Sequence, residues 1–346
     1  MKLLILTQKV DKNDSMLGFF HRWIEEFSKH SEQLTVVCLQ EGEHSLPENT
    51  RVFSLGKEKG KSKFKYIFNF YKYIILERKN YDAVFVHMNQ EYVLLGWKLW
   101  KLMGKKIILW RNHSQGNFLT DMAVFLSNAV CCTSKSSYTV RFKKTKIMPV
   151  GIDEEVFKKN PSIQKNNQAI LSLGRISPVK KIDVLISALV LLDERGIDFK
   201  AAIYGDTPKR DAAYSEQLRK QGKVLLSKNK LEFHEGIPNS KVPDIFNTYG
   251  IFVNLTPTGS FDKTILEAMA CESLTVFSNN FISDAVFQKT LVKQDDAVSL
   301  ASILESVLQN GDSGEYEEIR KKGRAYVLSH HTLSRLAQDI SALLMP

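Results

Sequence analysis

Residues 169–189 read AILSLGRISPVKKIDVLISAL, and this stretch decides the fold. An apolar run ends at Gly174 and an amphipathic segment begins near Lys181, as expected for a buried strand, a loop and a helix. Arg175 and Lys180 lie in the loop. A planar guanidinium fork close to a compact ammonium suits an anion with two or more negative charges, such as a diphosphate. On these residues alone, two solvated cations on a surface loop are an equal alternative.

The same alternation of short apolar runs and longer amphipathic segments continues in both directions, which is typical of parallel sheets covered by helices. The polar stretch KKNPSIQKNNQ at 158–168 divides the strands into two series. We therefore predict an α/β fold with two doubly wound Rossmann-like domains, 1–160 and 161–330, whose ligand edges face a central cleft. The expected strands are Leu3–Leu6, Leu34–Leu39, Val52–Ser54, Ala83–His87, Lys106–Trp110, Ala129–Cys132, Ala169–Leu173, Lys200–Tyr204, Leu231–His234, Ile251–Leu255 and Leu274–Phe277.

A second motif follows one of these strands, where residues 254–271 read NLTPTGSFDKTILEAMAC. The strand breaks at a proline, a turn carries Gly259 and Ser260, and an amphipathic helix is expected to start near Asp262. The N–H groups and the dipole at such a helix start favour an anion. Glu267 lies on this helix between apolar residues and could accept hydrogen bonds from two ribose hydroxyls. The alternative is a carboxylate in a surface salt bridge.

Several function classes lack their signatures in this chain. The first expected strand is followed by TQKVDKNDSMLG at 7–18 and not by the G-x-G-x-x-G turn of dinucleotide-binding folds, which disfavours a dehydrogenase. P-loop, H-E-x-x-H, G-x-S-x-G and kinase patterns are also missing. Because no D-x-D ends a strand and no His, Cys, Asp and Glu cluster has ligand spacing, we expect no metal and no other cofactor.

The sequence also predicts the compartment. The four cysteines, Cys38, Cys131, Cys132 and Cys271, show neither C-x-x-C nor Cys/His spacing, which fits a reduced cytosol. Only five residues, 3–7, precede the first polar stretch, which is too short for a signal-peptide core. No run of about 18 apolar residues occurs, so a membrane-spanning helix is not expected. We predict a cytoplasmic protein whose contact with a membrane would be peripheral.

Four segments, in this order, resemble the motif series of the retaining GT4-type glycosyltransferases, which have the GT-B fold. They are VGIDEEVF at 150–157, LGRISPVKKIDVLISAL at 173–189, IYGDTP at 203–208 and TPTGSFDKTILEAMAC at 256–271. The resemblance spans most of the chain and is strongest over 146–277. It implies transfer of a sugar from a UDP- or GDP-linked donor to a saccharide, a lipid-linked sugar or another precursor of a cell-envelope polysaccharide. It also implies that 331–346 forms a helix that crosses back to the first domain.

The family's functional residues carry over to positions in this chain. The basic pair that holds the donor diphosphate corresponds to Arg175 and Lys180, and the ribose-binding glutamate corresponds to Glu267. In the first domain, a small residue that faces the diphosphate corresponds to Gly18, and a histidine that contacts the donor sugar corresponds to His113 in RNHSQGN. The donor-binding set implied by the resemblance is Gly18, Gly174, Arg175, Lys180, Gly205, Gly259, Ser260, Phe261, Asp262, Lys263 and Glu267. The catalytic set is His113, Arg175, Lys180 and Asp262.

Some of these assignments have alternatives on the residues alone. A glycine at position 18 is as well explained by helix packing, and a histidine after a strand is often a plain loop residue. His87, in FVHMN, is a second strand-end histidine. The sequence therefore gives two candidates for a histidine at the ligand edge of the first domain.

The chain departs from the family pattern at one position. The common E-x7-E pattern puts another glutamate eight residues before Glu267, where this chain has Gly259. That glutamate normally lies near the donor sugar, so Asp262 and Lys263 are the expected substitutes. Because the loop and the following helix are otherwise intact, we interpret TGS-x-DK as a variant of the motif. A catalytically inactive GT-B binding module is the alternative that this departure raises.

The resemblance also implies a mechanism. Retaining transfer would pass through an oxocarbenium-like transition state while negative charge grows on the departing diphosphate. Arg175, Lys180 and the helix start after Gly259 would stabilise that charge, so no metal is required. No residue is an obvious general base, and family members are thought to pass the acceptor proton to the leaving phosphate.

The net charge of +10 is concentrated in the first half, where residues 1–150 hold 24 Lys and Arg against 13 Asp and Glu. The densest run is Lys57–Lys79, with eight basic and two acidic residues. We expect one apolar helix face in this run, made by Phe64, Ile67, Phe68, Tyr71, Ile74 and Ile75. A second cluster, Gly96–Lys106, places Trp97 and Trp100 beside lysines. An anionic membrane surface is the expected partner of both segments, and simple covering of the sheet is the alternative.

Two further functions remain open. A GT-B-fold nucleotide-sugar epimerase would share the architecture, but it would be expected to carry extra catalytic carboxylates. A nucleic-acid-binding protein is suggested by the pI near 9.2 and the aromatic residues. No recognisable nucleic-acid module occurs, so no nucleic-acid partner is expected.

Overall fold

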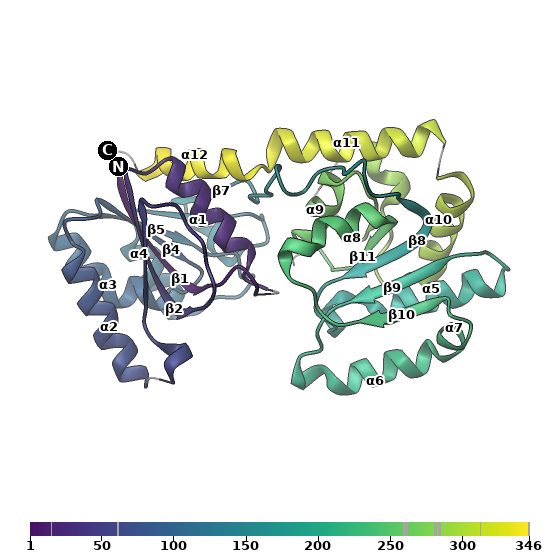
Figure 1. The fold of residues 1–346 in the computed structure, drawn as a ribbon, viewed down its shortest axis with the longest axis horizontal. Helices are drawn as coiled ribbons and strands as arrows, with labels where there is room; N and C mark the ends of the chain where they lie inside the picture. Colours follow the sequence, from purple (N-terminus) through teal and green to yellow (C-terminus); the bar gives the residue numbers. More distant parts are fainter. Residues whose placement is uncertain are drawn as a thin grey trace. The chain divides into compact units, whose positions relative to one another are not determined.

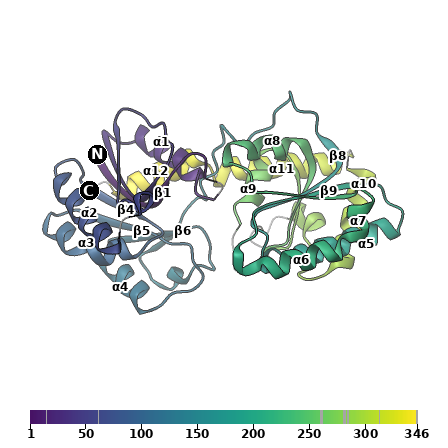
Figure 2. The same ribbon diagram turned by 60° about the horizontal axis from the view of Figure 1, so that its bottom comes forward.

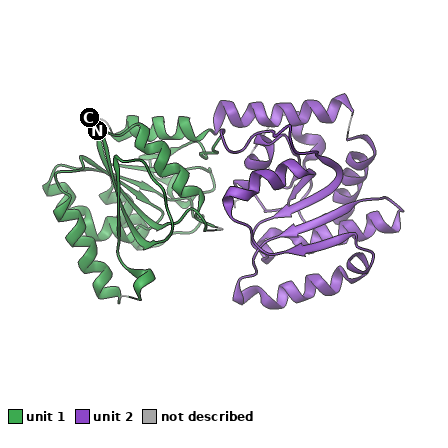
Figure 3. Cartoon of the chain, viewed as in Figure 1, with its two compact units in different colours: residues 1–153, 332–346 green, residues 154–331 purple. Residues whose placement is uncertain are grey.

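The computed structural model describes residues 1–14, 16–60, 62–258, 262–279, 282, 285–311 and 313–344. The chain divides into two compact units (Figure 3). Unit 1 comprises residues 1–153 and 332–346, and unit 2 comprises residues 154–331. Each unit is built around its own parallel sheet (Figure 1).

Unit 1 contains a seven-stranded sheet in the order β3-β2-β1-β4-β5-β6-β7. Helices α1 and α12 bury Phe20, Trp23 and Leu336 against one face of this sheet. Helices α2, α3 and α4 cover the other face. The strands are β1 (Lys2–Val10), β2 (Gln33–Glu41), β3 (Thr50–Ser54), β4 (Ala83–His87), β5 (Lys106–Trp110), β6 (Ala129–Cys132) and β7 (Thr145–Ile147). The helices are α1 (Phe19–Lys29), α2 (Lys63–Leu76), α3 (Glu91–Leu102), α4 (Phe118–Leu126) and α12 (Leu333–Leu344).

Unit 2 contains a five-stranded parallel sheet in the order β10-β9-β8-β11-β12. Helices α8, α9 and α11 lie on one side of the sheet, and α5, α6 and α7 on the other (Figure 2). The strands are β8 (Asn166–Leu173), β9 (Lys200–Tyr204), β10 (Leu231–His234), β11 (Tyr249–Asn254) and β12 (Leu274–Phe277). The helices are α5 (Ile182–Glu194), α6 (Ala212–Gln221), α7 (Lys223–Ser227), α8 (Val242–Thr248), α9 (Thr264–Ala270), α10 (Ala297–Asn310) and α11 (Gly314–His330).

All eleven strands expected from the sequence are present, and the α/β fold class is confirmed. Six of them, β4, β5, β6, β9, β10 and β12, have the expected bounds. The sequence missed β7, an edge strand of three residues, because TKI contains a single large apolar residue. Buried parallel strands stand out as apolar runs, and an exposed edge strand does not.

The strand order places the ligand-binding edge of each unit. Both sheets are doubly wound, and the direction of winding changes between β1 and β4 in unit 1 and between β8 and β11 in unit 2. In such sheets, ligands bind outside the carboxyl ends of the strands at this switch point. The two motifs of the sequence, around Arg175 and Asp262, follow β8 and β11 and therefore meet at the switch point of unit 2.

The expected apolar face of residues 57–79 is only partly right. Of its members Ile74 is buried and Tyr71 half-buried, whereas Phe64 is 85% exposed and Phe68 is 69% exposed. Phe70, which lies outside the predicted face, is buried instead and stacks on Tyr92 at 5.7 Å between ring centroids. The exposed aromatic residues of α2 are therefore left without a role in covering the sheet.

The two tryptophans of Gly96–Lys106 have different environments. Trp100 is fully buried and meets the Phe70 ring edge to face at 5.9 Å, so it belongs to the core and cannot act as a lipid anchor. Trp97 is half-buried, with the ammonium of Lys98 5.6 Å from the centre of its ring.

Cations hold the C-terminal end of α9, the helix that carries Glu267. The ammonium of Lys165 donates to the carbonyl oxygens of Cys271 (3.1 Å) and Glu272 (2.9 Å), and Arg324 donates to that of Ala270. Positive charge at this end satisfies carbonyls that have no intrahelical partner and opposes the negative end of the helix dipole. The C-terminal end of this short helix is thus fixed by side chains from other elements.

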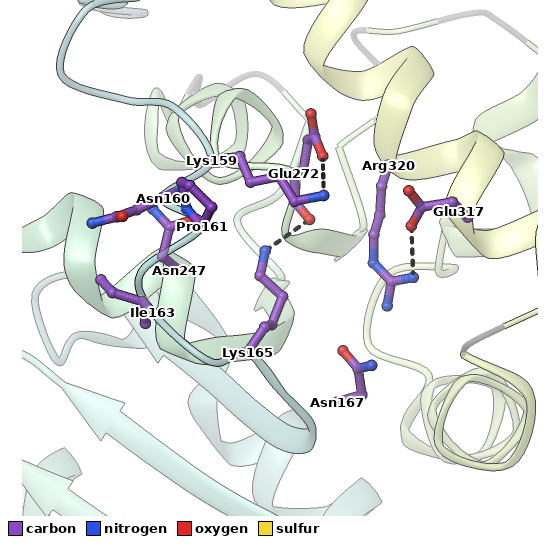
Figure 4. A pocket seen from close by; sticks show the side chains of 10 residues that line it. All are labelled: Lys159, Asn160, Pro161, Ile163, Lys165, Asn167, Asn247, Glu272, Glu317 and Arg320. Atoms are coloured by element: carbon purple, nitrogen blue, oxygen red, sulfur yellow. Dashed lines mark hydrogen bonds and ion pairs between the residues drawn. The ribbon is translucent and has the colours of Figure 1, made fainter.

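Lys165 also lines a cavity of about 540 Å³ at the amino-terminal edge of the unit 2 sheet (Figure 4). The cations of this cavity are engaged: Lys159 pairs with Glu272 at 3.0 Å, and Arg320 donates to the carbonyl oxygen of Gly311 at 2.7 Å. The cavity therefore belongs to the anchoring of α9, at the edge opposite the switch point.

Burial lowers the pKa of Lys165 from 10.5 to about 8. As pH rises above 8, Lys165 loses its proton in the folded protein but keeps it in the unfolded chain. The free energy of unfolding therefore increases with pH between the folded pKa of about 8 and the unfolded pKa of 10.5. Between pH 7.5 and 10, the free energy of unfolding should rise by about 2 kcal/mol more in the wild type than in Lys165→Met. Urea denaturation at both pH values measures this difference. Parallel pH dependence in the two proteins would contradict the prediction, and Lys159→Met is the matched control.

Candidate functional site

Two glycines bring the loops after β8 and β9 into direct contact. Gly174 has φ +140°, a conformation that favours glycine, and its N–H donates to the carbonyl oxygen of Tyr204 at 3.0 Å. A β-carbon on Gly205 would lie 1.9 Å from the carbonyl oxygen of Gly174. A side chain at position 205 would therefore push the β9 loop away from the loop that carries Arg175 and Lys180.

Lys180 lies directly over Gly174. A β-carbon at position 174 would meet both Cε and Nζ of Lys180 at 3.4 Å. The Lys180 ammonium forms an ion pair and a hydrogen bond with Asp262, and the Lys180 side chain is mostly buried. Arg175, five residues earlier, is exposed. The loop after β8 thus presents one fixed and one exposed cation at the switch point.

Asp262 is the centre of a hydrogen-bond network. Its Oδ2 accepts from Asn254 Nδ2 at 2.7 Å as well as from Lys180, and its Oδ1 accepts from the hydroxyl (2.9 Å) and backbone N–H (3.2 Å) of Thr264. Burial alone would raise the pKa of Asp262, but the charge of Lys180 and these hydrogen bonds hold it at about 2. The carboxylate is therefore ionised at neutral pH and joins the end of β11, the β8 loop and the start of α9.

Glu267 lies in the first turn of α9, where it is only 2% exposed. Its Oε1 is 2.7 Å from the ammonium of Lys263, one helical turn earlier. The structure thus pairs Lys263 with Glu267, while Asp262 is paired with Lys180. The sequence singled out Gly259, Ser260 and Phe261 in the same loop, and these three lie outside the described residues.

In unit 1, Gly18 occupies a turn that has no room for a side chain. Its N–H donates to the carbonyl oxygen of Asp14 at 3.0 Å, and a β-carbon at position 18 would lie 2.5 Å from that oxygen. The carboxylate of Asp14 accepts from the backbone N–H groups of Met16 (2.9 Å) and Leu17 (2.7 Å). Gly18 is therefore needed to form the turn that starts α1 at the ligand edge of unit 1.

The two candidate histidines of unit 1 differ in exposure. His87 is 4% exposed, stacks on Phe20 at 4.0 Å and bonds through Nδ1 to the hydroxyl of Thr7 at 3.2 Å. Burial lowers the pKa of His87 to about 3, so it is a neutral core residue. His113 is exposed, and its Nδ1 lies 2.9 Å from the backbone nitrogen and 3.1 Å from the carbonyl oxygen of Gln115. Of the two, His113 is the one accessible to a ligand.

The structure therefore gathers seven of the residues singled out in the sequence around the start of α9 and the end of β8. They are Gly174, Arg175, Lys180, Gly205, Asp262, Lys263 and Glu267. Asn254 and Thr264 were missed, although an Asp two residues before a Thr at a helix start is a recognisable capping pattern. Arg111, directly after β5, was also passed over and is half-buried at the ligand edge of unit 1.

Comparison with known proteins identifies the family. Residues 153–326 match the family described as glycosyl transferases group 1, and residues 13–114 match the family described as glycosyl transferase 4-like. The alpha-monoglucosyldiacylglycerol synthase of Streptococcus pneumoniae is 24% identical over 226 residues. That match covers 60% of this chain and 46% of the synthase, so the chain spans about half the length of this relative.

Solved structures show the same fold over the whole chain. HepE from Anabaena, in complex with UDP and glucose, is similar with a TM-score of 0.75 at 18% identity, covering 99% of both chains. The sucrose-phosphate synthase of Thermosynechococcus elongatus is similar with a TM-score of 0.71 at 15% identity, covering 99% of this chain and 98% of the synthase. The chain therefore has the GT-B fold and belongs to the glycosyl transferases group 1 family.

Proposed function

We propose that this protein is a retaining glycosyltransferase, which transfers a sugar from a nucleotide-diphosphate donor to a saccharide or lipid-linked acceptor. The observation that carries the proposal is the placement of Lys180 over Gly174 at the switch point of unit 2, with Arg175 on the same loop. The complex of HepE with UDP and glucose supports a donor of this class.

In the proposed reaction, the bond between the sugar C1 and the β-phosphate oxygen breaks, and a bond from C1 to an acceptor oxygen forms on the same face. The acceptor proton passes to the departing phosphate. Lys180 and Arg175 stabilise the charge that grows on the diphosphate, which lowers the barrier because the charge is larger in the transition state than in the bound donor. We propose that this charge stabilisation needs no metal ion.

Asp262 acts on the reaction through Lys180. Its carboxylate has hydrogen bonds to several groups besides the lysine, so its geometry favours a positioning role over direct contact with the donor sugar. Glu267, held beside Lys263, is an acceptor-only carboxylate that suits the ribose hydroxyls. The exposed imidazole of His113 is the proposed contact from unit 1 to the donor sugar.

The proposal is tested first by a thermal-shift screen of UDP, GDP and ADP and of their sugar conjugates. One nucleoside diphosphate should raise the melting temperature, because a ligand that binds only the folded state stabilises it. NMR of the product formed with that donor should show the anomeric configuration of the donor. A product with the inverted anomeric configuration would refute retention. Binding of the donor with neither sugar transfer nor donor hydrolysis would favour a catalytically inactive module.

Lys180→Gln should lower turnover by about 10²–10³-fold, because it removes a charge that stabilises the departing diphosphate. Lys181→Gln is the matched control. The neighbouring Lys181 pairs with Asp295 at 2.8 Å on a more exposed site. Steady-state kinetics and circular dichroism of both variants measure the effect. Near wild-type turnover by Lys180→Gln would disprove its role.

Asp262→Asn should destabilise the fold by about 3 kcal/mol, because it leaves the mostly buried Lys180 without its carboxylate. In the double variant Asp262→Asn with Lys180→Met, stability should recover while activity stays low, since the two residues form one interacting pair. Urea denaturation and turnover assays of the wild type, both single variants and the double variant complete this cycle. Additive losses of stability would argue against the pair.

We propose further that unit 1 attaches the enzyme to an anionic membrane surface through α2. Phe64 and Phe68 are exposed on this helix beside the exposed Lys63 and Lys65. Exposed aromatic residues among lysines suit the interface of an anionic bilayer. Within the described part of the chain, no helix is long and apolar enough to cross a membrane.

The double variant Phe64→Ser with Phe68→Ser should weaken binding to vesicles that contain phosphatidylglycerol by about tenfold or more. The reason is that the variant lacks the two aromatic rings that would move from water into the bilayer interface on binding. Vesicle co-sedimentation at low and high salt measures the affinity. Val298→Ser, at an exposed apolar position of unit 2, is the control. Equal binding to neutral and anionic vesicles by the wild type would refute the attachment.

A further inference from the structure

A hollow of about 420 Å³ lies at the amino-terminal edge of the unit 1 sheet. It is formed where α3 ends and β5 begins, and where α4 ends before β6. Figure 2 shows α3 and α4 next to each other on one face of this sheet. The residues proposed to meet the donor follow the carboxyl ends of the strands, so this hollow is a separate feature.

The hollow is lined by cations and by no carboxylate. Lys101, Lys105 and Lys106 are among its ten lining residues, and none of the ten is Asp or Glu. Lys144, next to the hollow, donates to the carbonyl oxygens of Phe125 (3.1 Å) and Ser127 (2.8 Å). Lys105 likewise donates to a backbone carbonyl, that of residue 81. Carbonyl partners orient these ammonium groups without cancelling their charge, so the local potential is positive.

Large exposed apolar side chains lie at this positive hollow: Phe125 lines it, and Leu102 follows the lining residue Lys101 in the chain. Leu102, the last residue of α3, is 84% exposed, and Phe125, near the end of α4, is 79% exposed. A soluble protein seldom gathers exposed apolar residues of this size around one feature unless they meet a partner. The partner must therefore offer negative charge and apolar surface together.

We propose that this hollow binds the phosphate headgroup of an anionic phospholipid, with Leu102 and Phe125 in the acyl-chain region. The proposal rests on the membrane attachment proposed above and gives it a defined headgroup site. A free phosphate ion would satisfy the lysines but would leave both apolar side chains in water. A second copy of the chain is disfavoured, because two surfaces rich in lysine would repel each other.

The test compares the adjacent pair Lys101 and Leu102 with a matched pair in unit 2. Lys101→Gln with Leu102→Ser should weaken binding to phosphatidylcholine vesicles containing phosphatidic acid by about tenfold. Lys223→Gln with Val224→Ser alters an equally adjacent, exposed lysine and apolar residue, and it should bind like the wild type. All four side chains are exposed, so the folds should be unaffected, which circular dichroism checks.

Each outcome decides between the proposals. Wild-type binding by the Lys101 and Leu102 variant, with loss in the Phe64 and Phe68 variant, would overturn the headgroup site and leave membrane attachment intact. A wild-type protein that ignores vesicles would overturn both, while the donor screen still decides glycosyl transfer on its own. In a thermal-shift assay, dihexanoyl phosphatidic acid should stabilise the wild type more than inorganic phosphate. Equal stabilisation by inorganic phosphate would overturn the choice of a lipid.

Discussion

Lys180 and Asp262 are 82 residues apart in the sequence, and their ion pair joins the loop after β8 to the start of α9. Without the carboxylate, the ammonium over Gly174 would be a costly, mostly buried charge. Without the ammonium, Asp262 would still cap Thr264 but would no longer connect α9 to the β8 loop. The geometry that suits a diphosphate depends on this single contact.

This contact also implies how a donor would be accommodated. A diphosphate would bring its own negative charge to Lys180 and would share the ammonium with Asp262. An ammonium has three donors, which allows one cation to serve both partners. The carboxylate would then hold the lysine in position while a phosphate binds, and the entropy of ordering this long side chain would already be lost when the protein folds.

The sequence predicts the architecture well because buried parallel strands leave a strong signal. β4 and β5 are bounded by polar residues on both sides of an apolar run, and the structure reproduces their expected limits. Helix α2 shows where this logic fails. Its aromatic residues fall on overlapping stripes, and sequence periodicity cannot tell which stripe faces the sheet. Phe70 faces the sheet, where its ring meets Tyr92 and Trp100, and these contacts exist only in the folded chain.

The candidate site shows the same limit. The order of the motifs predicts that Arg175, Lys180 and Asp262 follow the strands of one switch point, since strand order places the loops. It does not predict that Asp262 pairs with Lys180, nor that Asn254 joins them. These pairings depend on side-chain directions within a few ångströms. Motif order carries no information at that scale.

Helix α9 has only seven residues, fewer than two turns, and a helix of this length does not persist alone in water. It is held at one end by Asp262 and at the other by Lys165 and Arg324, and residues 265–270 between these ends are buried. Local unfolding of α9 would have to break the contacts at both ends and expose these buried side chains at the same time. Helix α9 should therefore open only when much of unit 2 opens, which makes its order a global property of the unit.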